Sequence, residues 1–168
     1  FLVEAQRHYD VQGVELSDFS SKFAREHLGL NVITGTLIEA SLPPEHFDVI
    51  TMWDVIEHVP NPHEILAEAW RVLKPGGCII LTTGDVGCAY AQARGPDWHL
   101  MAPPWHLYYF SKATITHMAH EVGLLVSGCT VHGTFSDHPF FRQRVVRVTA
   151  NLLGFGDIMQ MTLTKPIV

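Results

Sequence analysis

The stretch FDVITMWDVIEHVPNPHEILAEAWRVLKPGGCIILTT, residues 47–83, places a helical pattern between two short apolar runs. The flanking runs are FDVITM at 47–52 and CIILTT at 78–83. Both are bounded by loop signals and are typical of strands buried on both faces of a parallel sheet. Between them, Asn61 suits a helix N-cap and Pro62 suits the first helical position. The order strand, helix, strand predicts two parallel strands joined by a crossover helix.

The same alternation continues on both sides of this stretch. Further strands are predicted at VQGVEL (11–16), NVITG (31–35) and LLVSGCTV (124–131), and further helices at 18–28, at 111–122 and from Pro139 to about Leu153. Alternating strands and helices predict an α/β fold with a doubly wound, mostly parallel sheet. The tail MQMTLTK at 159–165 instead alternates apolar and polar residues, which indicates one late antiparallel strand with a wetter face.

Composition narrows the classes of function. The chain has 168 residues, and 17 acidic against 11 basic residues give a net charge of -6. No basic stripe is visible, so we expect no nucleic-acid partner. The three cysteines form no C-x-x-C pair, which favours a reducing cytoplasm. No apolar run approaches the roughly 20 residues of a membrane-spanning helix.

Two segments carry a resemblance to a known family. Residues 47–83 closely resemble the block of class I S-adenosylmethionine-dependent methyltransferases that reads F-D-V-V, then E-H-V, then L-K-P-G-G. HLYYFSKATITHMAHEVGL, residues 106–124, resembles the H-x-x-x-F-S helix of the small-molecule branch that includes ubiquinone-pathway O-methyltransferases. GVELS at 13–17 is similar to the second strand with its acidic end. The resemblance implies a Rossmann-like fold, S-adenosylmethionine as cofactor with S-adenosylhomocysteine as product, and a small-molecule methyl acceptor.

The chain departs from this family at its start. The family opens with a strand and a D/E-x-G-x-G-x-G turn, whereas this sequence begins at Phe1, where that turn should have ended. We therefore expect a single methyltransferase-like domain over 1–168, truncated at its N-terminus, with the first strand and glycine turn absent. The missing turn would hold the methionine part of the cofactor through backbone N–H groups.

Cofactor contacts are expected where the predicted strands end, because open α/β sheets bind ligands outside the carboxyl ends of their strands. By resemblance, Glu15, followed by Leu16, is the acid that binds the ribose hydroxyls; a solvated strand-end glutamate is the alternative. Where the family often has an aspartate for adenine, this chain has Thr36, a weaker acceptor. Adenine contact would then rest on backbone groups near Leu37, unless this is a plain loop.

Trp53 and Asp54 follow the next strand at the same expected edge. By resemblance they contact the methionine and ribose part of the cofactor, and the Trp53 face could attract the sulfonium by a cation–π contact. The alternative is a tryptophan buried in the core.

Residues 84–110 break the regular pattern and are predicted to be an irregular substrate lid. Aromatic and imidazole side chains in this segment suit an apolar or aromatic acceptor with one polar handle. His106 is the candidate general base, because imidazole titrates near neutral pH; a loop hydrogen bond is the alternative for His106 and the expected role of His99.

No metal site is predicted. His117 and His120 share a helix, but no H-E-x-x-H or C-x-x-C motif accompanies them. Two other functions remain open beside methyl transfer. One is a catalytically silent methyltransferase-like binding subunit, and the other is a nicotinamide-dependent oxidoreductase on a similar sheet.

Overall fold

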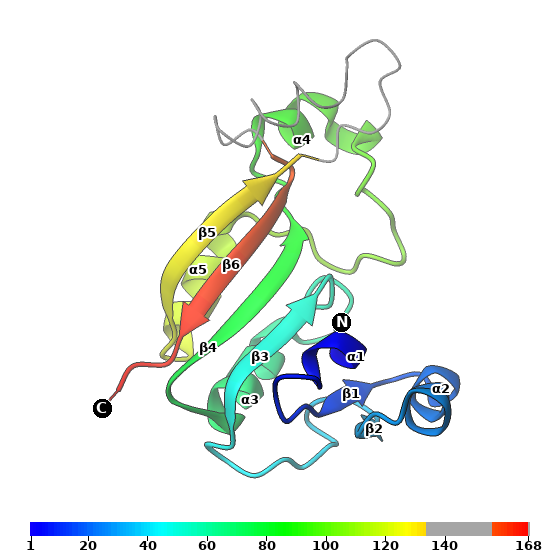
Figure 1. Cartoon of the computed structure of the whole chain (residues 1–168). Coiled ribbons are helices and arrows are strands. Elements are labelled where there is room, and N and C mark those ends of the chain that lie inside the picture. Colours follow the sequence, from blue (N-terminus) through cyan, green and yellow to red (C-terminus); the bar gives the residue numbers. More distant parts are fainter. Residues whose placement is uncertain (134–155, 168) are drawn as a thin grey trace. The chain divides into compact units, whose positions relative to one another are not determined.

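The computed structural model describes residues 1–133 and 156–167. The chain divides into two compact units, Phe1–Pro43 and Pro44–Val168 (Figure 1). Each unit has its own sheet, so the single domain expected over 1–168 stays a prediction. The helix expected from Pro139 to Leu153 lies outside the described residues.

The first unit is a small β-α-β arrangement. Its elements are α1 (Leu2–Ala5), β1 (Gly13–Glu15), α2 (Asp18–Leu28) and β2 (Val32–Thr34). β1 and β2 pair in parallel. The Ser17 hydroxyl accepts a hydrogen bond from the Ser20 amide, and the helix α2 ends at Gly29 with φ +65°. The start of α2 after Ser17 and its end at Gly29 are as the sequence predicted.

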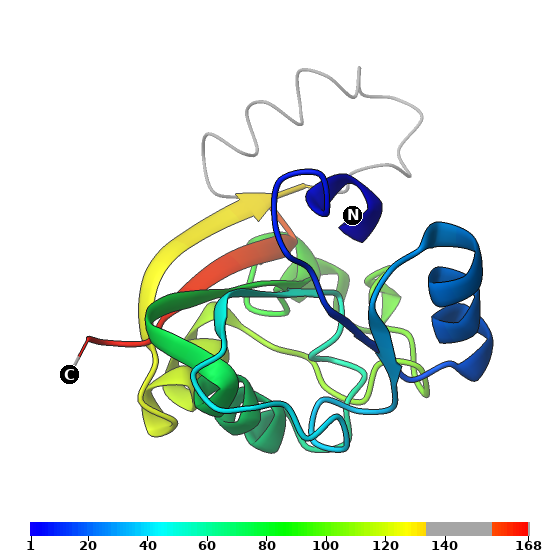
Figure 2. The ribbon, with the colours of Figure 1, turned by 60° about the horizontal axis from the view of Figure 1, so that its bottom comes forward.

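The second unit contains a four-stranded sheet. Its elements are β3 (Phe47–Trp53), α3 (Pro62–Val72), β4 (Leu73–Gly84), α4 (Ala89–Arg94), the 3₁₀ turn η1 (Gly95–Asp97), α5 (Lys112–Glu121), β5 (Leu125–His132) and β6 (Ile158–Thr164). The strand order is β3-β4-β6-β5. β3 and β4 are parallel, and β6 is antiparallel to both β4 and β5. Helices α3 and α5 lie on the same face of this sheet (Figures 1 and 2).

Strand β6 is the late antiparallel strand that the sequence predicted in this α/β fold. Met159, Met161 and Leu163 on β6 are fully buried, as their alternation indicated. They pack in the sheet beside the fully buried Ile79 and Leu81 of β4. The core of the second unit therefore sits on its two central strands.

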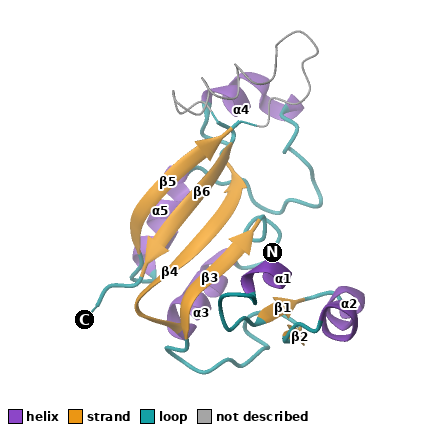
Figure 3. Ribbon diagram, in the orientation of Figure 1, coloured by secondary structure: helices purple, strands orange, loops and turns teal. Residues whose placement is uncertain are grey.

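Two expectations about local structure were wrong. FDVITM was predicted to be buried on both faces, but Val49 is 49% exposed, because β3 lies at the edge of its sheet. Residues 84–110 were predicted to be irregular, but they contain α4 and η1 before a loop from Trp98 to Phe110 (Figure 3). Within 1–133 and 156–167, no helix combines the length and apolar character needed to cross a membrane.

Helix α5 begins with a complete capping box. The Ser111 hydroxyl accepts from the Thr114 amide, and the Thr114 side chain reaches back to the Ser111 amide. We expect Ser111→Ala to lower the free energy of unfolding by about 1 kcal/mol, because one amide loses its partner. Urea denaturation measures this change. The exposed neighbour substitution Lys112→Ala should change stability by less than about 0.5 kcal/mol, and an equal loss in both variants would contradict this account.

Candidate active site

The carboxyl ends of β3 and β4 lie side by side at one edge of the second unit's sheet. Trp53 is paired with Thr82 across these strands. The amide of Asp54 donates to the Thr82 carbonyl at 3.2 Å, and the Asp54 carboxylate accepts from the Thr82 hydroxyl at 2.9 Å. Asp54 has φ +51°, a left-handed conformation that aspartate tolerates better than most residues. The chain therefore turns sharply after β3, and Trp53 stays 39% exposed at the edge where ligands are expected.

A small pocket lies beyond the end of β4. It is lined by residues from β4, from the turn after β3 and from the loop that follows η1: Glu57, Thr83, Gly84, Trp98, Leu100, His106, Tyr108, Tyr109 and Phe110. A Cβ atom on Gly84 would lie 2.9 Å from side-chain atoms of both Trp98 and Leu100. Glycine at this position therefore lets the aromatic wall approach the strand.

The wall of this pocket is fastened to the turn that follows β3. The Leu107 amide donates to the Glu57 carbonyl at 2.8 Å, and the Tyr108 hydroxyl donates to the Pro60 carbonyl at 2.9 Å. His58 Nδ1 lies 2.7 Å from the Trp105 carbonyl. The segment Trp105–Tyr108 of the predicted lid is thus held by hydrogen bonds to the turn after β3 and forms one wall of the pocket. That residues 84–110 act as a substrate lid stays a prediction.

One ring nitrogen of His106 bonds to the backbone, and this contact fixes the tautomer of the neutral ring. Its Nδ1 lies 2.7 Å from the Leu100 carbonyl. A carbonyl only accepts, so Nδ1 carries the hydrogen and, in the neutral ring, Nε2 carries the lone pair. The same reasoning applies to His58, whose ring centroid is 4.8 Å from that of His106.

A buried carboxylate completes this cluster. Glu57 is 4% exposed. One ligand atom each from Glu57, His58 and His106 lies within 4.8 Å of the others. Two imidazoles and a carboxylate are ligands that zinc accepts, and the same acceptors can instead share a proton. That no residue of the chain ligates a metal stays a prediction.

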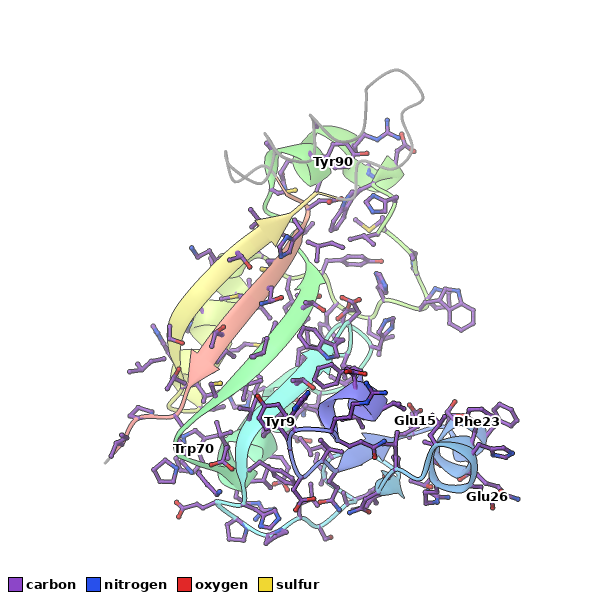
Figure 4. All side chains as sticks on the ribbon, in the orientation of Figure 1. Tyr9, Glu15, Phe23, Glu26, Trp70 and Tyr90 are labelled. Carbon is purple, nitrogen blue, oxygen red and sulfur yellow. The ribbon has the colours of Figure 1, made fainter. Side chains whose placement is uncertain are left out.

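The predicted residues of the first unit lie at the carboxyl ends of β1 and β2. Glu15 is the last residue of β1 (Figure 4). One of its carboxylate oxygens accepts from the Ser17 amide at 2.8 Å. Leu16 is 72% exposed. The amide and hydroxyl of Thr36 both donate to Glu39 at 2.8 Å, and these bonds hold the pKa of the Glu39 carboxyl below its usual value.

Sequence reasoning missed Glu39, although the spacing Thr36-x-x-Glu39 is itself a capping-box signal. It also missed the buried Asp157, which accepts from the Trp98 indole at 3.2 Å and lies 3.5 Å from His99 Nδ1. Within the first unit, Glu15 and Leu16 lie at the end of β1, and Thr36 and Leu37 follow the end of its partner strand β2. In the second unit, Trp53 and Asp54 lie at the end of β3. The expected meeting of Glu15 with Trp53 spans both units and stays a prediction.

Comparison with known proteins places these features in a family. Residues 1–127 match a family model described as a methyltransferase domain. A ubiquinone biosynthesis O-methyltransferase of Thiobacillus denitrificans is 32% identical over 126 residues, covering 68% of this chain and 54% of that protein. One from an Azoarcus species is 38% identical over 85 residues, covering 47% of this chain and 36% of that protein. The chain thus spans 36% and 54% of the lengths of these two relatives.

A solved structure shows the same fold. A Thermotoga maritima protein described as an S-adenosylmethionine-dependent methyltransferase, possibly a histamine N-methyltransferase, aligns with a TM-score of 0.70 at 23% identity. The alignment covers 98% of this chain and 76% of that one. At this identity the likeness confirms the Rossmann-like fold class.

Proposed function

The chain belongs to the methyltransferase domain family, and from this premise we propose that the protein transfers a methyl group from S-adenosylmethionine to a small-molecule hydroxyl. The observation that carries the proposal is the pocket at the end of β4, where His106 lies beside the buried Glu57 carboxylate. Nδ1 of His106 donates to the Leu100 carbonyl, so Nε2 carries the lone pair of the neutral ring. The net charge of -6 also favours a small acceptor over a nucleic acid. Three free cysteines are compatible with a reducing compartment, and we place the protein in the cytoplasm.

The proposed cofactor residues lie at the carboxyl ends of strands β1, β2 and β3. Bound S-adenosylmethionine would supply the methyl group on a positively charged sulfonium. One oxygen of the Glu15 carboxylate accepts a hydrogen bond from the Ser17 amide. The remaining lone pairs of the carboxylate can accept hydrogen bonds from the ribose hydroxyls. The exposed Trp53 ring offers its face to the sulfonium, with Asp54 beside it. In this proposal Leu16, Thr36 and Leu37 border the adenosyl group.

The proposed role of His106 is to take the proton of the acceptor hydroxyl. A positioned base contributes about 10²–10⁴-fold to rate, whereas alignment of the reactants and exclusion of water contribute up to about 7–11 kcal/mol. The bonds that fasten Trp105–Tyr108 to the turn after β3 support such alignment, because they fix the wall that carries His106.

Calorimetric titration of the protein as its gene encodes it tests the cofactor assignment. We expect Glu15→Ala to weaken binding of S-adenosylhomocysteine about 10- to 100-fold, because hydrogen bonds to a charged acceptor are lost. Glu26→Ala removes an exposed carboxylate of α2 that pairs with Lys22 and should leave affinity unchanged. No heat from either S-adenosylmethionine or S-adenosylhomocysteine would refute the proposed function, and binding of NAD instead would favour the oxidoreductase alternative.

A further inference from the structure

The turn after β3 is held by one side chain of the neighbouring strand. Thr82 lies on β4 opposite Trp53, the last residue of β3. The Thr82 hydroxyl donates to Oδ1 of Asp54 at 2.9 Å and accepts from the Asp54 amide at 3.1 Å. The same amide also lies 3.2 Å from the Thr82 carbonyl. One threonine thus contacts both the backbone and the side chain of the residue that follows β3.

The two hydroxyl bonds fix how the Asp54 carboxylate is oriented. A carboxylate has no hydrogen to give, so the Thr82 hydroxyl hydrogen points to Oδ1, and the Asp54 amide fills a lone pair of the same hydroxyl. Threonine is also β-branched, which restricts the rotation of its side chain. The Asp54 side chain is exposed, and among residues 1–133 and 156–167 its Oδ2 has no hydrogen-bond partner. This oxygen is therefore available to a ligand while the other holds the carboxylate in place.

The backbone conformation of Asp54 indicates that its side chain is needed. Asp54 has φ +51°, a region that glycine adopts without steric penalty. Glycine would therefore suffice if the turn required only this conformation. Aspartate adopts it at some cost, and such residues are retained mainly at functional sites.

A carboxylate that is already oriented binds a cation better than a mobile one. An exposed ion pair gains little when a free side chain must first be ordered, and holding the side chain in its bound conformation removes part of that cost. The proposed function places S-adenosylmethionine at this sheet edge, and the methionine part of that cofactor carries a sulfonium and an ammonium. The Thr82 hydroxyl can therefore strengthen an ion pair in which it takes no part.

We propose that Thr82 is a positioning residue, which orients the Asp54 carboxylate so that Oδ2 pairs with the positively charged methionine part of S-adenosylmethionine. The assignment rests on the proposed function, for which it names a residue of β4 that acts through Asp54.

Calorimetric titration with S-adenosylmethionine tests this role. Thr82→Val keeps the shape of the side chain and the backbone bond to the residue 82 carbonyl, and it should weaken binding about three- to tenfold. Thr82→Ser restores a hydroxyl and should bind within about twofold of the wild type. Asp54→Asn removes the charge and should weaken binding about tenfold. Thr130→Val makes the same exchange at an exposed position of β5 and should match the wild type.

The double variant Thr82→Val with Asp54→Asn separates positioning from a purely structural role. If Thr82 acts through Asp54, Thr82→Val should cost less than about twofold in the Asp54→Asn background, because no charge remains to be oriented. Independent effects would instead multiply to about 30- to 100-fold, and that result would overturn the assignment. Unchanged affinity in either single variant would overturn it as well.

Failure of this assignment differs from failure of the proposed function. Wild-type binding of S-adenosylmethionine that Thr82→Val leaves intact rejects only the positioning role, whereas no binding by the wild type rejects the proposed function. Should Thr82→Val fail to fold, Thr82→Ala in both backgrounds gives the same comparison, since it also removes the hydroxyl.

Discussion

Replacing His106 with glutamine should lower the rate of methyl transfer to the acceptor hydroxyl by about 10²- to 10⁴-fold, because this imidazole is the proposed base. In the neutral ring Nε2 carries the lone pair, because Nδ1 donates to the Leu100 carbonyl at 2.7 Å. Glutamine keeps polar character but cannot take up a proton at neutral pH. The rate of S-adenosylhomocysteine release measures the effect.

His58→Gln is the matched control for this prediction. His58 also places Nδ1 against a backbone carbonyl, but it is exposed and does not line the pocket. The rate should therefore fall much less than in His106→Gln. Equal losses in the two variants would mean that the histidines act together on loop structure, and His106 would lose its assigned role as base.

Leu81→Ala is expected to have the largest effect on stability. Leu81 is fully buried on the central strand β4, where it pairs with Met52 of β3 and Met161 of β6. Shortening this side chain removes apolar contact and leaves a cavity, so the free energy of unfolding should fall by about 2–5 kcal/mol. Urea denaturation of the whole protein measures this change.

Leu125→Ala provides the comparison, because Leu125 lies on the edge strand β5 and is 55% exposed. It should lose less than half as much stability as Leu81→Ala. A similar loss at both positions would show that β4 is not the packed centre of this sheet.

Local signals in the sequence predicted the helices well. The side chains of Ser17, Asn61 and Ser111 each accept a hydrogen bond from a backbone amide in the first turn of a helix. Donor and acceptor are only three positions apart, so the local sequence is enough to predict such a cap. The alternation in β6 likewise depends on neighbours alone, and it correctly predicted both the strand and its buried face.

Features set by distant residues could not be predicted in the same way. The exposure of β3 depends on its place at the edge of the sheet, and an apolar run does not reveal strand order. Helix α4 has six residues, too few for a clear helical period. Burial of Glu57 in a pocket with Tyr109 requires contacts between segments far apart in the chain.

The same limit applies to the candidate site. Motifs at strand ends predicted Glu15, Trp53 and Asp54 individually, because each follows from the rule that ligands bind beyond the carboxyl ends of strands. Partners such as Thr82 and Asp157 were missed, since 28 residues separate Asp54 from Thr82 and 59 separate Trp98 from Asp157.

A crystal structure of the protein with S-adenosylhomocysteine tests most directly whether one adenosyl ligand is shared by both units. We predict that the Glu15 carboxylate accepts hydrogen bonds from the ribose hydroxyls while the Trp53 side chain contacts the same ligand molecule. A bound ligand that touches neither residue, or Glu15 and Trp53 lying on opposite ends of the protein, would contradict the methyltransferase site described above.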